Sequence, residues 1–103
     1  ADRIRRVVLL GPSHRVGFRG LAASSADAYE TPFGIIPLDK SAIARIQALP
    51  QVHLLDEAHR HEHSLEVQLP FLQAVLDDFK LVPLVVGDAT PREVAEVLEH
   101  LWG

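Results

Sequence analysis

The side chains best suited to chemistry in this sequence are histidines, and one of them follows an apolar run. His14 ends the motif Gly-Pro-Ser-His at 11–14, directly after the apolar segment 6–11. In α/β proteins, binding sites lie beyond the carboxyl ends of the strands. Neutral imidazole serves there as a metal ligand or an acid–base group. His14 is therefore a candidate metal ligand, and the alternative is a loop histidine that is hydrogen-bonded to the backbone.

A second group of chemical side chains lies in residues 59–66. Its members are His59, His61, Glu62, His63 and Glu66. Histidines and carboxylates in this density suit a hard or borderline metal. The metalloprotease pattern His-Glu-x-x-His is absent, however, because this sequence reads His-Glu-His at 61–63. The alternative is a solvated loop that leads into a helix, where Glu66 favours the positive helix N-terminus.

Other polar residues near the first apolar run are less specific. Arg15 and Arg19 flank His14 and could attract an anionic group, or they could be ordinary surface charges. Asp88 follows a second apolar run, where closing a turn at Gly87 is the simpler interpretation. The sequence contains no Gly-x-Gly-x-x-Gly motif, no P-loop and no Gly-x-Ser-x-Gly elbow, which argues against nucleotide binding through these motifs and against a serine hydrolase.

Two apolar runs predict the strands that would carry these residues. Segments 6–11 and 81–87 are short, continuous and rich in Val and Leu, as in parallel strands that are covered on both faces. We expect them to be neighbours or near-neighbours in one sheet. The proline within 81–87 indicates an irregular or edge position for that strand. Residues expected to be buried are Leu9, Leu69, Leu72 and Val85.

The remaining segments predict helices and short strands around that sheet. Asp39 is a favourable N-cap for a helix over 40–49, and a second helix is expected over 64–78 with Pro70 inside it. Thr90 and Glu93 form a capping box at the start of a third helix. Short strands are expected at 21–25 and 52–55, with an irregular extended stretch over 27–38 and a polar segment over 56–63. This order predicts an α/β fold of three α/β/α layers with a mostly parallel or mixed sheet.

Composition excludes several classes of protein. The chain has 103 residues, 14 acidic and 10 basic, and a net charge of −4, which predicts no nucleic-acid partner. No apolar run in the sequence is long enough to span a membrane. The sequence has no cysteine, which excludes a disulfide scaffold or a cysteine nucleophile within these 103 residues. The first residues resemble no targeting peptide, so we expect a cytoplasmic protein. A sequence without Met that starts almost on a strand suggests a single partial domain over 1–103, cut from a longer parent.

Four blocks of sequence together resemble a known family. They are Leu-Leu-Gly-Pro-Ser-His at 9–14, Ala-Ala-Ser-Ser-Ala-Asp-Ala-Tyr-Glu-Thr-Pro-Phe-Gly at 22–34, Glu-His-Ser-Leu-Glu-Val-Gln-Leu-Pro-Phe-Leu at 62–72 and Leu-Val-Pro-Leu-Val-Val-Gly at 81–87. Their order and spacing are similar to those of the Memo family, the protein B component of the AmmeMemoRadiSam system. The resemblance covers essentially the whole chain.

The resemblance implies a fold similar to that of class III extradiol (LigB-like) dioxygenases. Those enzymes hold Fe(II) with two histidines and a carboxylate, whereas Memo-like proteins keep the two histidines, replace the carboxylate with a cysteine and retain an Asp/His pair. His14 matches the second of the two histidines by its motif, and Glu62 and His63 are the catalytic residues expected to line the pocket. The first histidine, the Asp/His pair and the cysteine belong to family segments that this sequence does not contain.

The resemblance leaves two functions open for the parent protein. The first is metal-dependent redox or oxygen chemistry with Fe(II) or another divalent metal. The 103-residue chain by itself is expected to bind no metal. The second is a non-enzymatic module that binds a phosphorylated or anionic peptide through Arg15, Arg19 and His14. A local metal site on the 59–66 group is a third interpretation. The small molecule or peptide that the protein binds is not specified by the sequence.

Overall fold

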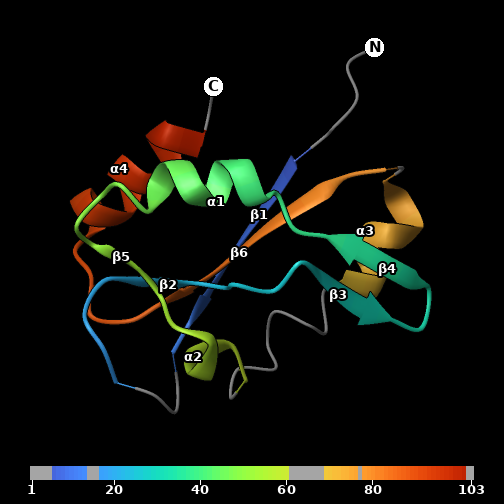
Figure 1. Cartoon of the computed structure of the whole chain (residues 1–103), viewed down its shortest axis with the longest axis horizontal. Helices are drawn as coiled ribbons and strands as arrows, with labels where there is room; N and C mark the ends of the chain where they lie inside the picture. Colours follow the sequence, from blue (N-terminus) through green and yellow to red (C-terminus); the bar gives the residue numbers. More distant parts are fainter. Residues whose placement is uncertain (1–5, 14–16, 61–68, 77, 102–103) are drawn as a thin grey trace.

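The computed structural model describes residues 6–13, 17–60, 69–76 and 78–101, which alternate between strands and helices (Figure 1). Their elements, in chain order, are β1 (Arg6–Pro12), β2 (Leu21–Ala23), β3 (Ala28–Thr31), β4 (Gly34–Pro37), α1 (Lys40–Ile46), β5 (Val52–Leu54), α2 (Asp56–Arg60), α3 (Leu69–Val75), β6 (Lys80–Val86) and α4 (Pro91–Leu101). The α/β class expected from the sequence is therefore confirmed.

The main sheet is mixed and has the strand order β1-β6-β2-β5. β1 and β6 run parallel in register along their whole length, from Arg6 opposite Lys80 to Pro12 opposite Val86. β2 is parallel to β5 but antiparallel to β6, which it meets only at Val85 and Val86. The prediction that the two apolar runs are neighbouring strands is confirmed.

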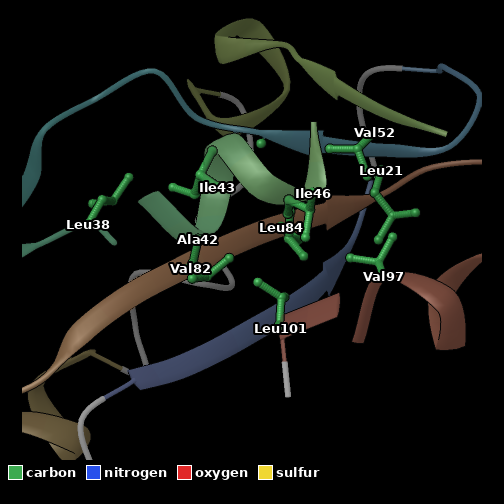
Figure 2. Packing of buried hydrophobic residues seen from close by; sticks show 11 residues of the cluster. Leu21, Leu38, Ala42, Ile43, Ile46, Val52, Val82, Leu84, Val97 and Leu101 are labelled. Carbon is green, nitrogen blue, oxygen red and sulfur yellow. The ribbon is translucent and has the colours of Figure 1, made fainter. Parts of the chain in front are cut away.

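Helices cover both faces of this sheet because the strand side chains alternate between them. On one face, Val82 and Leu84 of β6 pack with α1 and α4, and Figure 2 shows this cluster around Ile46 and Val97. On the other face, Leu81 packs with Leu69 of α3 and with the β3–β4 hairpin. Figure 1 shows α1 and α4 together at the top of the molecule and α2 at the bottom, with β2 and β6 between them. This arrangement is the α/β/α layering that the sequence predicts.

The predicted helix caps are present. The Asp39 carboxylate accepts a hydrogen bond from the Ala42 backbone N–H at 3.1 Å and so begins α1. Thr90 and Glu93 exchange the two bonds of a capping box, at 3.1 and 2.9 Å, at the start of α4. Arg6 adds a link that the sequence pattern does not reveal, because its guanidinium binds the Asp39 carboxylate and the Leu101 carbonyl.

Asp39 illustrates how these links affect ionisation. Burial alone would raise the pKa of its carboxyl group. Hydrogen bonds from Arg6, Ala42 and Ser41 outweigh that effect, so the net pKa is lowered from its ordinary value of 3.8. The carboxylate that caps α1 is therefore held in the charged form.

The position of β6 differs from the prediction. Pro83 predicts an edge or irregular strand, but β6 lies between β1 and β2. On the side of β6 that faces β2, Leu81 is bridged to Leu38, and Val85 and Val86 pair with β2, so Pro83 lies between these pairs and its missing N–H interrupts no ladder. Of the two strands, β1 is the one at an edge of the sheet, and Leu9 on it is half-buried rather than buried.

Three further segments depart in detail from expectation. Residues 27–38 form a regular antiparallel hairpin around the predicted turn at Thr31–Gly34, and not an irregular stretch. Residues 56–60 of the expected polar segment 56–63 form the helix α2, and residues 61–63 lie outside the described residues. The predicted helix over 64–78 is helical over Leu69–Val75, where Leu69 is buried and Leu72 half-buried, and its first part lies outside the described residues.

Shortening a buried side chain on α1 should cost stability. Ile46 is 0% exposed in the cluster between α1, α4 and the sheet, so Ile46→Val is expected to lower the free energy of unfolding by about 0.5–1.5 kcal/mol. Ile35 on β4 is 67% exposed, and Ile35→Val should change it by less than about 0.5 kcal/mol. Urea unfolding of both variants checks the difference, and equal losses would contradict this account of the core.

Candidate functional site

The carboxyl ends of β1 and β6 are joined by a network of backbone hydrogen bonds. Ser13 N–H donates to the Val86 carbonyl at 2.9 Å, which fixes the chain where it leaves β1. Further along, Asp88 N–H donates to the Phe18 carbonyl at 2.8 Å, and Gly87 N–H donates to the Gly20 carbonyl at 2.9 Å. We call residues 13, 18–20 and 86–88 the strand-end cluster. Both ends of the loop between β1 and β2 are therefore hydrogen-bonded to residues 86–88, at the end of β6.

A close approach at Gly87 makes this closure possible. A Cβ atom at position 87 would lie 2.4 Å from the Phe18 carbonyl oxygen and 2.8 Å from its ring. At the other side of the cluster, Gly20 has φ +84°, and a Cβ atom there would lie 2.1 Å from the Gln51 carbonyl oxygen. Both positions require glycine, because no side chain fits and the second also has left-handed backbone geometry.

Helix α2 packs beside the strand-end cluster. Ala58 is fully buried against Ala22 of β2 and Val85 of β6, and the half-buried Phe18 joins the same contact. The carboxyl-end region of β6 therefore has the β1–β2 loop on one flank and α2 against the face of the sheet. Because α2 ends at Arg60, the chain leaves it from this neighbourhood.

His59 connects α2 to two strands. Its Nε2 lies 2.8 Å from the Ala22 carbonyl oxygen, and its Nδ1 lies 3.2 Å from the Tyr29 hydroxyl. Burial lowers the pKa of the His59 imidazole from its ordinary value of 6.5, although the Ala22 carbonyl and the Asp56 charge oppose the shift. The neutral ring is therefore favoured in the folded protein.

Asp56, at the start of α2, anchors the loop after β2. Its carboxylate accepts hydrogen bonds from the Ser25 hydroxyl and backbone N–H, the latter at 2.8 Å, and from the Ser24 hydroxyl at 3.3 Å. The Ser25 hydroxyl bond and then the Ser25 N–H bond are the main reasons that the pKa of Asp56 is lowered from 3.8. Asp56 thus stays ionised and holds α2 against the chain that leaves β2.

The candidate residues proposed from the sequence are close in sequence to these elements. His14, Glu62 and His63 are outside the described residues, as are Arg15, His61 and Glu66. Arg19 and Asp88 are exposed, and their backbones form a bridge within the strand-end cluster. Within the described ranges, no group of three or more His, Cys, Asp and Glu side chains could hold a metal ion.

The network of Tyr29, Asp56 and His59 is not recognisable from the sequence as one unit. The sequence presents His59 only as a member of a possible metal cluster. A signal is present in the spacing of Asp56 and His59, because positions i and i+3 share one side of a helix. Recognising it requires knowing that residues 56–60 are helical.

Comparison with known proteins identifies the family. The family model for the Memo-like protein matches residues 1–102. The chain belongs to the Memo-like protein family. A MEMO1 family protein of Aquifex aeolicus is 44% identical over 82 residues, covering 79% of this chain and 31% of the relative. One from Archaeoglobus fulgidus is 43% identical over 94 residues, covering 86% and 34% respectively.

A third Memo-like relative, from Saccharolobus solfataricus, is 42% identical over 94 residues, which cover 89% of this chain and 33% of the relative. The chain therefore spans about a third of the length of the curated Memo-family relatives that it matches. The family suggested by the four sequence blocks is confirmed. In the parts of the chain that the structure describes, no helix is both long and apolar enough to cross a membrane.

The shifted pKa of His59 predicts an acid-sensitive stability. The pKa of His59 in the folded protein lies below 6.5, so folding disfavours the protonated imidazole. The stability that His59 contributes is therefore complete above about pH 6.5 and is lost as the pH falls through the folded-state pKa. The lowered pKa values of Asp39 and Asp56 act only below about 3.8. Urea unfolding between about pH 7 and 5 should show the loss, and His59→Gln should flatten it. His53→Gln, at an exposed position on β5, should leave it in place.

Proposed function

We propose that the full-length protein is a metal-dependent redox or oxygen-handling enzyme and that this chain supplies one side of its site. The observation that carries the proposal is the strand-end cluster, which holds Ser13 at 2.9 Å from Val86 at the carboxyl ends of a parallel strand pair. His14 follows Ser13 directly in the sequence. A metal ligand must be supported by a rigid backbone, and a hydrogen-bonded strand end is such a support.

His14 is the residue of this chain that would hold the metal, as one imidazole ligand. Fe(II) or another divalent metal that is held by two histidines and a third ligand, with open positions, would supply redox or oxygen chemistry when it is bound. The described residues do not complete such a set. His59 is a poor ligand because both of its ring nitrogens already have partners in Ala22 and Tyr29. The other ligands of the proposed site therefore come from family segments beyond this sequence, and Fe(II) or another divalent metal binds only to the longer protein.

Glu62 and His63 are proposed as the acid–base residues of the same site. They follow Arg60, the last residue of α2, and α2 packs through Ala58 on Val85 of β6. The described residues that precede His14 and His63 in the sequence, Ser13 and α2, are therefore both held near the end of β6. A neutral imidazole next to a carboxylate can take up and return a proton near neutral pH, which is the role we assign to the pair.

A metal titration of the full-length protein and of the 103-residue chain tests this proposal. Anaerobic calorimetry with Fe(II), and with Cu and Zn for comparison, should give tight binding to the full-length protein alone. Tight binding to the chain by itself would favour the local site on residues 59–66. No metal binding to either, together with binding of a phosphorylated peptide that a chelator does not change, would favour the non-enzymatic module.

The described residues give the peptide-binding alternative less support. Of its two arginines, only Arg19 lies among them, and the backbone of Arg19 is bridged to Asp88. The exposed Asp88 carboxylate adds negative charge where an anionic peptide would have to bind. We therefore retain that function only as an outcome of the titration.

A further inference from the structure

Helix α2 is too short to be stable by itself. It spans Asp56–Arg60, five residues, whereas isolated helices need about 12–15 residues to form appreciably in water. Its position must therefore be fixed by contacts with other elements. The buried Ala58 supplies an apolar contact with Ala22 and Val85, but a methyl group sets neither the rotation nor the tilt of the helix.

The directional contacts come from His59. The Ala22 carbonyl can only accept a hydrogen bond, so the His59 proton must be on Nε2, at 2.8 Å from that oxygen. Nδ1 is then an acceptor, and the Tyr29 hydroxyl donates to it at 3.2 Å. One imidazole thus joins α2 to β2 and β3, at residues that precede His59 by 37 and 30 positions in the sequence.

Asp56 supplies a second directional contact on the same side of α2. Its carboxylate is bonded to Ser24 and Ser25, which directly follow β2. The two contacts come from residues three positions apart on one side of α2, so together they define the rotation of the helix about its axis. The titratable groups around His59 among the described residues are Asp56 on its own helix and Tyr29 on β3, and β2 contributes none.

We propose that His59 is a positioning residue, a neutral Nε2–H imidazole that fixes α2 on β2 and β3 and thereby sets where the chain leaves α2 toward Glu62 and His63. The assignment deepens the proposed function, on which its catalytic meaning rests. It also removes His59 from the possible metal ligands, since a metal would have to displace the Ala22 carbonyl or the Tyr29 hydroxyl.

Nuclear magnetic resonance of the full-length protein with labelled histidines tests the assignment. The nitrogen shifts of His59 should show the Nε2–H tautomer in the unmodified protein. His59→Gln can retain a donor toward Ala22, so amide exchange in α2 should accelerate less than in His59→Ala. Tyr29→Phe removes a single hydroxyl, and should accelerate that exchange about fivefold to tenfold. In the double variant Tyr29→Phe/His59→Ala, exchange should be slower than the product of the two single effects predicts, because the bond between the Tyr29 hydroxyl and His59 Nδ1 is already absent in His59→Ala.

The positioning role has its own signature. The ring resonances of His63 should shift in His59→Ala and partly return toward their original values in His59→Gln, while His53→Gln should not move them. An Nδ1–H tautomer, effects of Tyr29→Phe and His59→Ala that multiply, or unmoved His63 resonances would overturn the proposal. Failure of the proposed function would be seen in a different experiment, as metal affinity that is unchanged by His14→Ala. That result would leave the tautomer of His59 and the amide exchange of α2 unchanged.

Discussion

His14→Ala in the full-length protein is expected to lower metal affinity by about a hundredfold or more. Loss of residues that only support metal ligands typically costs about 10–100-fold, so removal of a ligand itself should cost at least the upper end of that range. The fold should survive, because the hydrogen bond of Ser13 to Val86 uses backbone atoms that the substitution leaves in place. Anaerobic calorimetry with Fe(II) measures the affinity, and circular dichroism checks the fold.

His53 provides the matched control for that experiment. It is an exposed histidine on β5, the strand at the opposite edge of the main sheet from β1. His53→Ala should leave metal affinity within about twofold of the unmodified protein, since it removes an imidazole that is distant from the strand-end cluster in the sheet order. Equal affinities in the His14→Ala and His53→Ala proteins would refute a metal site at the end of β1.

The elements that the sequence predicts best are those whose stability is local or strongly patterned. β1 and β6 are continuous apolar runs, and the caps at Asp39 and Thr90 depend on residues within three positions of one another. Such signals need no knowledge of the rest of the fold. The sequence therefore predicts the parallel pair, and with it the strand end at which His14 is proposed to act.

The elements that the sequence misses depend on distant partners. Residues 56–60 span little more than one helical turn, and among the side chains described at 56–59 Ala58 is the one that is fully buried, so the segment shows no periodicity. Its anchors Ala22 and Tyr29 lie in β2 and β3. The half-burial of Leu9 likewise follows from the place of β1 at the sheet edge, which an apolar run cannot reveal. In both cases tertiary contacts, rather than local preference, decide the outcome.

Gly87→Ala is expected to lower the free energy of unfolding by about 3–5 kcal/mol. The added Cβ would lie 2.4 Å from the Phe18 carbonyl oxygen, so the backbone around Phe18 or around Gly87 must move. That movement strains or breaks the bonds of Asp88 to Phe18 and of Gly87 to Gly20, each worth about 1 kcal/mol, in addition to an overpacking cost of about 1–3 kcal/mol. Urea unfolding of the full-length protein and its variant measures the loss.

Two further variants identify the cause of that loss. Gly17 lies in the same loop, and a Cβ atom there would meet no other atom within 4 Å, so Gly17→Ala should change stability by less than about 1 kcal/mol. The closest contact at Gly87 is with a backbone oxygen and not with the Phe18 ring, so adding Phe18→Leu should not restore the stability of Gly87→Ala. Recovery in that double variant would mean that ring packing, and not closure of the β1–β2 loop on the end of β6, is what requires glycine at this position.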